Sequence, residues 1–253
     1  MTRDPDHPAG RASRRGFLIG GAASALALDA GTVEAQQATS VAPQRPDAVV
    51  PPGCPPQPGQ VPTRGPQGYR FLTNPEVETL TAMADRLIPA DDLGPGAVEA
   101  GVVTFIDREL GGQFGAAARW YMAGPWAEGA PSQGWQLALT PAQIYRIGFL
   151  ALDRWCLGVN GKRFVDLGPA DQDAVLTLLE QGKIDLDGVS SAAFFQLVWQ
   201  NVVEGYLADP VYDGNRGMAG WRLLNFPGTN PALTEAVALN GEVYRIDPVS
   251  IGA

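Results

Sequence analysis

The sequence predicts an all-α protein: a small bundle of five or six helices with long irregular loops and a proline-rich N-terminal arm. Apolar residues recur at spacings of three and four in several segments, most of which begin at a capping residue and end near Gly or Pro. No segment shows the alternation of apolar and polar residues that is typical of a half-buried strand. The 31 Gly and 22 Pro among 253 residues indicate long irregular connections.

Residues 1–35 are predicted to be a twin-arginine signal peptide that is cleaved after Ala35. The run Ser-Arg-Arg-Gly-Phe-Leu at residues 13–18 matches the twin-arginine pattern and leads into an apolar stretch that ends at Leu28. That stretch is about a dozen residues long, which suits a signal core but falls short of the roughly 20 residues that cross a bilayer. An ordinary Sec signal or an uncleaved anchor is the alternative. The arginine pair favours the twin-arginine pathway, which carries folded chains to the periplasm.

Residues 36–67 form the predicted proline-rich arm. The stretch 50–56 can be neither a helix nor a central strand, because each of its prolines lacks an amide donor and has a fixed φ. The arm is either a disordered linker or a strap that lies on another subunit, and the strap is slightly favoured. In the oxidising periplasm the two cysteines, Cys54 and Cys156, can pair with each other, or one can bond to a neighbouring chain. The sequence leaves both pairings open.

Residues 68–253 are predicted to form one helical domain with an irregular C-terminal tail. Asn74 is the expected N-cap of the first helix, with Pro75 at its first position. A capping box of Thr140 and Gln143 begins the fourth helix. The predicted helices span residues 74–88, 96–110, 114–122, 141–157, 169–182 and 191–207.

The scarcity of histidine and cysteine excludes much catalytic chemistry. The single histidine, His7, lies in the predicted signal, so the mature chain has no imidazole for a Ser-His-Asp triad, a general base or a metal ligand. The two cysteines cannot supply all the thiolates of an iron–sulfur cluster, and no Cys-x-x-Cys-His sequence is present for haem attachment. The net charge of −9 argues against nucleic acid as a partner.

Several faint motifs have simpler interpretations. Residues 158–163 lack the Gly and the Ser or Thr that a phosphate loop requires, and residues 185–188 are interpreted as a turn rather than as part of a calcium loop. Asp107 beside Arg108 is interpreted as a helix-surface or interface charge. We therefore identify no catalytic, cofactor-binding or metal-binding residue in this chain.

Three segments carry a resemblance to a known family. They are residues 84–107, which begin Ala-Asp-Arg-Leu-Ile-Pro, residues 119–126, and residues 205–228, which include Tyr-Asp-Gly-Asn-Arg. Together they closely resemble the gluconate 2-dehydrogenase subunit 3 family, the small subunit of membrane-bound, FAD-dependent sugar and polyol dehydrogenases. Asp213 departs from the Tyr-Gly-Gly-Asn of many members, but Asp tolerates the left-handed conformation that such a turn requires.

The resemblance implies a non-catalytic subunit in a larger complex. It implies a large subunit that is a flavoprotein of the glucose-methanol-choline type and holds FAD, and a multi-haem cytochrome c subunit that holds haem c and passes electrons to quinone. The small subunit would help the flavoprotein fold, escort it through the twin-arginine translocase and stay bound to it. The complex would then lie in the periplasm, associated with the inner membrane.

Four residues of the 209–228 loop are the candidates for contact with the large subunit. Tyr212, Trp221 and Phe226 would be desolvated anchors, and Arg216 would pair with a carboxylate. The alternative, weighted equally, is that these residues close the small subunit's own core.

Two other functions compete with this interpretation. A stand-alone periplasmic carbohydrate-active enzyme would be active as a purified chain, and a carbohydrate-binding module would use its loop tryptophans and show ligand-induced quenching. The sequence does not indicate which sugar or polyol the complex would oxidise, because the partner makes those contacts.

Overall fold

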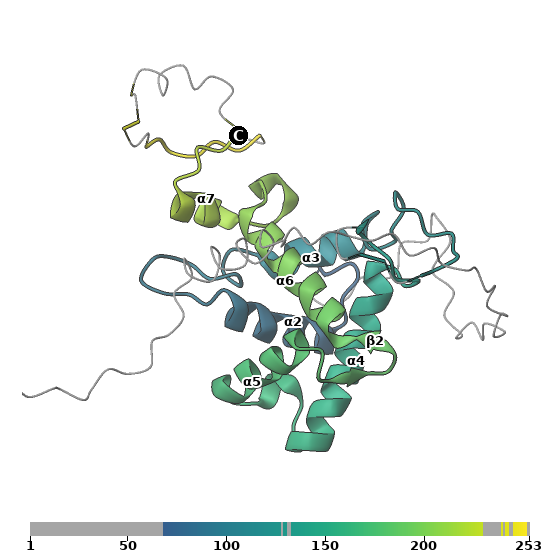
Figure 1. Cartoon of the computed structure of the whole chain (residues 1–253). Helices are drawn as coiled ribbons and strands as arrows, with labels where there is room; N and C mark the ends of the chain where they lie inside the picture. Colours follow the sequence, from purple (N-terminus) through teal and green to yellow (C-terminus); the bar gives the residue numbers. More distant parts are fainter. Residues whose placement is uncertain are drawn as a thin grey trace, which may run out of the picture. The chain divides into compact units, whose positions relative to one another are not determined.

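The computed structural model describes residues 68–127, 129–130, 133–229, 239, 241–242 and 245–251 (Figure 1). The predicted all-α class is confirmed, since these residues contain six α-helices and one two-stranded hairpin. The helices are α2 (Asn74–Leu87), α3 (Val102–Leu110), α4 (Pro141–Asn160), α5 (Pro169–Glu180), α6 (Ser191–Leu207) and α7 (Ala219–Leu224). The predicted signal peptide, the predicted arm and Cys54 lie outside the described residues.

Short elements complete the fold. The antiparallel strands β1 (Asp185–Leu186) and β2 (Val189–Ser190) form the hairpin, which is too short to give an alternating pattern in the sequence. Three 3₁₀ helices lie in the connections: η3 (Phe164–Asp166), η4 (Pro210–Tyr212) and η5 (Arg216–Met218).

Helix α6 is the centre of the fold. It contacts α2, α3, α4, α5 and α7, and Figure 1 shows it running between the helices of the bundle. Its side chains Phe194, Val198, Val202 and Tyr206 are fully buried. A helix that is apolar around most of its surface is stable only when neighbours cover it, which explains its central place.

A glycine allows α3 to lie close against α6. A Cβ at Gly205 of α6 would lie 2.6 Å from Cδ1 of Phe105 on α3, so only glycine leaves room for that ring. This close approach sets the separation of the two helices. It also places the segment that follows α6 beside the start of α3, where the Arg216 amide donates to the Ala100 carbonyl at 2.9 Å.

The start of the domain is held by a buried carboxylate. Asp107 of α3 is fully buried and accepts hydrogen bonds from the backbone amides of Arg70, Phe71 and Leu72 at 2.6, 2.9 and 2.8 Å. The interpretation of Asp107 as a surface or interface charge is therefore wrong. The chain entering α2 leaves three amides without carbonyl partners, and this carboxylate supplies the acceptors.

The predicted helix at residues 114–122 is wrong, because residues 113–119 form turns. The chain folds back tightly on the end of α3: a Cβ at Gly115 would lie 1.9 Å from the Leu110 carbonyl oxygen. Ala117 then has a φ of +50°, which no α-helix accommodates. The two glycines after Leu110 end α3, and the next residues do not resume a helix.

Two predicted helix starts are also corrected. The N-cap of α2 is Thr73 rather than Asn74, because the Thr73 amide donates to the Glu76 carboxylate at 2.8 Å in a capping box. Helix α3 begins at Val102 rather than at residue 96, since Gly101 has a φ of +81°. The predicted capping box of Thr140 and Gln143 is confirmed at the start of α4.

Candidate partner interface

The segment that follows α6 folds around two polar side chains with little exposed surface, Asp209 and Asn215. The amide nitrogen of the Asn215 side chain donates to the Ala208 carbonyl at 2.8 Å, and its carbonyl oxygen accepts from the Gly220 amide at 2.8 Å. Because Asn215 is fully buried and paired at both ends, it fixes the path of the chain from α6 into α7.

The Asp209 carboxylate joins the end of α6 to the C-terminal segment 245–251. It accepts from the Val211 amide at 3.0 Å, the Ser250 hydroxyl at 2.6 Å and the Ile251 amide at 2.9 Å. Burial raises the pKa of Asp209, but the hydrogen bonds from Ser250, Val211 and Ile251 outweigh it, so the pKa lies below its ordinary value.

The four candidate residues of the 209–228 loop differ in exposure. Trp221 is 5% exposed, and its indole N–H donates to the Leu207 carbonyl at 2.7 Å. Its ring also packs edge to face with Phe226, with centroids 5.3 Å apart. Trp221 therefore closes the chain's own core, whereas Phe226 and Tyr212 are 47% and 55% exposed.

Arg216 lies over the first turn of α3. A Cβ at Gly101 would lie 2.6 Å from its Nε, and its Nη2 donates to the Thr104 hydroxyl at 3.3 Å. Among the residues that the structure describes, no carboxylate forms an ion pair with this guanidinium. Most of its donors are therefore available to a partner's acceptor.

The turn that carries the resemblance has the expected backbone. Asp213 has a φ of +69°, so this residue does adopt the left-handed conformation. Its carboxylate also accepts from Nε of Arg108 at 3.4 Å, which ties the turn to α3.

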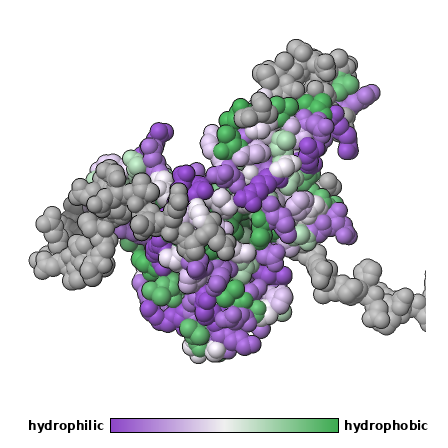
Figure 2. Space-filling model, turned by 180° about the vertical axis from the view of Figure 1, so that it is seen from behind, coloured by the Kyte–Doolittle hydropathy of each residue, from purple (hydrophilic) through white to green (hydrophobic). Residues whose placement is uncertain are grey.

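Exposed apolar side chains concentrate on this part of the chain. Six of the twelve large apolar side chains that are exposed in the described residues lie between residues 211 and 251, and we call this set the C-terminal apolar patch: Val211, Tyr212, Leu224, Phe226, Val249 and Ile251. Figure 2 shows hydrophobic surface beside hydrophilic residues on the part of the chain that carries α7. Apolar groups gathered on one segment mark an interaction surface better than scattered ones do.

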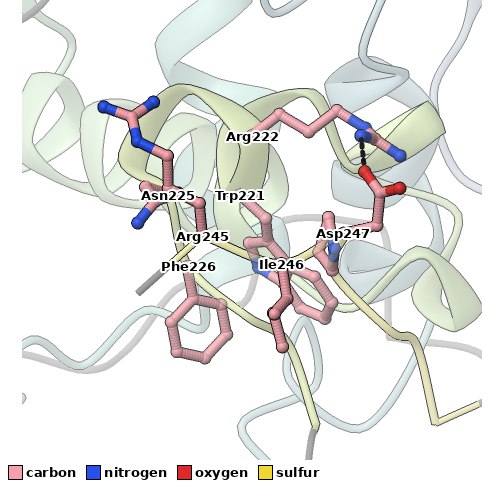
Figure 3. A pocket seen from close by; sticks show the side chains of 8 residues that line it. Trp221, Arg222, Asn225, Phe226, Arg245, Ile246 and Asp247 are labelled. Atoms are coloured by element: carbon pink, nitrogen blue, oxygen red, sulfur yellow. Dashed lines mark hydrogen bonds and ion pairs between the residues drawn. The ribbon is translucent and has the colours of Figure 1, made fainter. Parts of the chain in front are cut away.

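A hollow of about 400 Å³ separates α7 from the C-terminal segment (Figure 3). The Phe226 ring and the Ile246 side chain point the same way in this view, and the Arg222 guanidinium pairs with Asp247 at 2.7 Å. The hollow is lined by Trp221, Arg222, Asn225, Phe226, Arg245, Ile246, Asp247 and Pro248. The only carboxylate among these lining residues, Asp247, is already paired with Arg222. The sequence did not predict that residues 245–248 line the hollow, because they have no periodic pattern.

Cys156 is a fully buried side chain of α4 and forms no disulfide with any residue that the structure describes. Burial, with a smaller contribution from Asp153, raises the pKa of its thiol to about 12. The pairing of Cys156 with Cys54 or with a neighbouring chain stays a prediction.

The described residues hold neither a cluster of metal ligands nor a membrane-spanning helix. No group of three or more His, Cys, Asp or Glu side chains in this part of the chain is arranged to hold a metal ion. None of the helices described is both long enough and apolar enough to span a bilayer.

These features define a helical protein that exposes apolar and aromatic side chains on its C-terminal segment, as proteins that bind another protein do. A family model for gluconate 2-dehydrogenase subunit 3 matches residues 74–228. The chain therefore belongs to the gluconate 2-dehydrogenase subunit 3 family, as the resemblance of its sequence motifs predicted. No curated protein and no solved structure matches the chain. The matched range contains all four candidate residues of the 209–228 loop.

Proposed function

We propose that this chain is the non-catalytic small subunit of a periplasmic, FAD-dependent dehydrogenase complex that oxidises gluconate, another sugar or a polyol. It helps a flavoprotein large subunit of the glucose-methanol-choline type to fold, escorts it through the twin-arginine translocase and remains bound to it. FAD belongs to that large subunit, and haem c belongs to a multi-haem cytochrome c subunit that passes electrons to quinone. The complex is associated with the inner membrane.

The observation that carries this proposal is the C-terminal apolar patch, most of which lies within the family match. Tyr212 and Phe226 expose aromatic surface, and the guanidinium of Arg216 in the same loop forms no ion pair with any described carboxylate. Tyr and Arg are enriched among the residues that dominate binding energy at interfaces, and burial of apolar surface contributes roughly 25 cal/mol per Å². A partner subunit that covers the patch would remove this surface from water.

The predicted signal peptide supports the escort role. The twin-arginine pathway exports folded proteins, and a subunit with such a signal can carry a bound partner that lacks one. Replacing Arg14 and Arg15 by lysines should leave both this chain and the flavoprotein in the cytoplasm. If the flavoprotein still reached the periplasm, the escort role would be wrong.

Co-purification tests the assembly. A tagged full-length chain, expressed in its own host, should recover a flavoprotein with FAD absorbance and a haem c protein, and the recovered complex should reduce an artificial acceptor with a sugar or polyol. The chain purified alone should turn over none of these substrates. Turnover by the lone chain would support the stand-alone enzyme instead.

Matched variants test the patch. Tyr212→Ala with Phe226→Ala should weaken the complex at least about tenfold, because aromatic anchors commonly contribute more than about 1.4 kcal/mol each. The control is Leu150→Ala with Leu157→Ala, which removes two exposed apolar side chains of α4 outside the patch. Equal effects of the two pairs would contradict the assignment of the patch.

A further inference from the structure

Helices α3 and α6 border a second surface feature, a shallow groove of about 530 Å³. Its floor is apolar and is formed by Phe105 of α3 with Val203 and Leu207 of α6. Tyr212 also lines it, so the groove and the C-terminal apolar patch share this residue. We call it the α3–α6 groove.

Three carboxylates line the α3–α6 groove. Asp209 accepts hydrogen bonds from Ser250 and from two backbone amides, whereas Glu109 and Glu204 repel each other. Burial and the negative charge of Glu204 both raise the pKa of Glu109. Glu109 forms no hydrogen bond or ion pair through its carboxylate with any residue that the structure describes. Glu204 accepts a hydrogen bond from the neutral side chain of Gln200 at 2.8 Å.

The nearest arginine on α3 does not neutralise this pair. Arg108 donates instead to the Gly68 carbonyl at 3.1 Å and to Asp213 at 3.4 Å. Among the residues that the structure describes, no cation forms an ion pair with Glu109 or Glu204, so two like charges line an apolar groove. A cation placed there by another molecule would remove the repulsion.

We propose that the α3–α6 groove binds a segment of the large subunit that presents a lysine or arginine between Glu109 and Glu204, flanked by an apolar side chain that packs on Phe105 and Leu207. This inference rests on the proposed function, because it names the part of the partner that this surface takes. The aliphatic stem of a lysine or arginine also suits an apolar floor below a charged rim.

The negative charge of the groove favours a basic segment of the large subunit over a second copy of this chain or an anionic lipid headgroup. A second copy of the chain would bring two molecules of net charge −9 together, and an anionic lipid headgroup would be repelled by the carboxylates that line the groove. A basic segment of a partner is attracted by both. The chain's own Arg14 and Arg15 could also supply a basic side chain to the groove, and crosslinking distinguishes them from a segment of the large subunit.

The affinity of the complex tests the groove. Full-length chain carrying Glu109→Gln and Glu204→Gln should bind the FAD-containing large subunit roughly tenfold more weakly at low salt, with a shallower dependence on salt, than the wild-type chain does. The control is Glu180→Gln, which removes an exposed carboxylate at the end of α5 and should change neither quantity. An unchanged affinity and salt dependence in the double variant would overturn the proposal.

Crosslinking identifies the occupant. A photoreactive residue at Val203 should crosslink to a peptide of the large subunit that contains Lys or Arg, whereas the same residue at position 180 should not. A crosslink to residues of this chain, or none to the large subunit while the complex is intact, would overturn the proposal. If the wild-type chain formed no complex at all, the proposed function itself would fail, and that outcome is distinct.

Discussion

The Ser250 hydroxyl donates to the Asp209 carboxylate at 2.6 Å, across 41 residues of chain. Two backbone amides, those of Val211 and Ile251, donate to the same carboxylate. One side chain at the end of α6 thus holds both the start of the 209–228 loop and the C-terminal segment. The C-terminal apolar patch depends on this arrangement, since Val211 and Ile251 belong to it.

Asp209→Ala should release the C-terminal segment. The loss of three hydrogen bonds to a charged acceptor should lower the free energy of unfolding by about 2 kcal/mol, and the Ile251 amide should exchange with solvent faster. Chemical denaturation and hydrogen exchange of the full chain measure these effects. Asp92→Ala, which removes an exposed carboxylate, is the control and should change neither.

The contribution of Asp209 should depend on pH in one direction. Because its pKa is lower in the folded state than the unfolded value of about 3.9, its stabilising contribution is fully present above that value and is lost as the pH falls through the folded pKa. The difference in unfolding free energy between the wild type and Asp209→Asn should therefore shrink below about pH 4. A difference that stays constant down to pH 2 would contradict this.

Asp107→Ala should be among the most destabilising substitutions in the chain. It leaves the amides of Arg70, Phe71 and Leu72 without their acceptor at a fully buried site, and we expect a loss of about 3 kcal/mol or more in the free energy of unfolding. Its neighbour Arg108 is partly exposed, so Arg108→Ala should have a smaller effect, as chemical denaturation of both variants would show. Equal losses would mean that the buried acceptor is not the cause.

Asp107 also shows what the sequence can and cannot predict. The capping box at Thr140 and the apolar spacing of α6 are local patterns, and both predicted their helices. The partners of Asp107 lie more than 30 residues away, and the fold-back that replaces the predicted helix at 114–122 depends on contact with the end of α3. Tertiary contacts of this kind leave no periodic signal.

The same limit applies to the candidate interface. The family motifs located the 209–228 loop, but only packing separates the buried Trp221 from the exposed Phe226. Neither Glu109 nor Glu204 stands out in the sequence, because the α3–α6 groove joins helices that are far apart in the chain.

Trp221→Ala should act mainly on stability. Its ring is nearly fully buried, so truncation should lower the free energy of unfolding by about 3–5 kcal/mol, as for other buried aromatic residues. Phe226→Ala should cost clearly less, because its ring is half-exposed. Loss of the large subunit in the Trp221 variant would therefore reflect unfolding, whereas its loss in a folded Phe226 variant would report on the interface. Equal destabilisation of the two, measured by chemical denaturation, would contradict the packing described.

Glu204→Gln should stabilise the free chain while it weakens the complex. Removing one of two like charges should raise the free energy of unfolding by a few tenths of a kcal/mol at neutral pH. Because the pKa of Glu109 is higher in the folded chain than in the unfolded chain, the ionised Glu109 carboxylate destabilises the fold. This effect is fully present above the folded pKa and disappears as the pH falls to the unfolded pKa. The stability gained in Glu204→Gln should therefore vanish at low pH.

Titration of the Glu109 carboxyl by NMR provides the direct measurement. Its pKa should fall in Glu204→Gln but stay above the ordinary value, because burial is the larger of the two causes. Glu180→Gln should leave the Glu109 pKa unchanged, and an unchanged pKa in Glu204→Gln would show that the two carboxylates do not interact. If Glu204→Gln stabilises the chain yet weakens its binding to the large subunit, the Glu204 charge contributes to binding and not to folding.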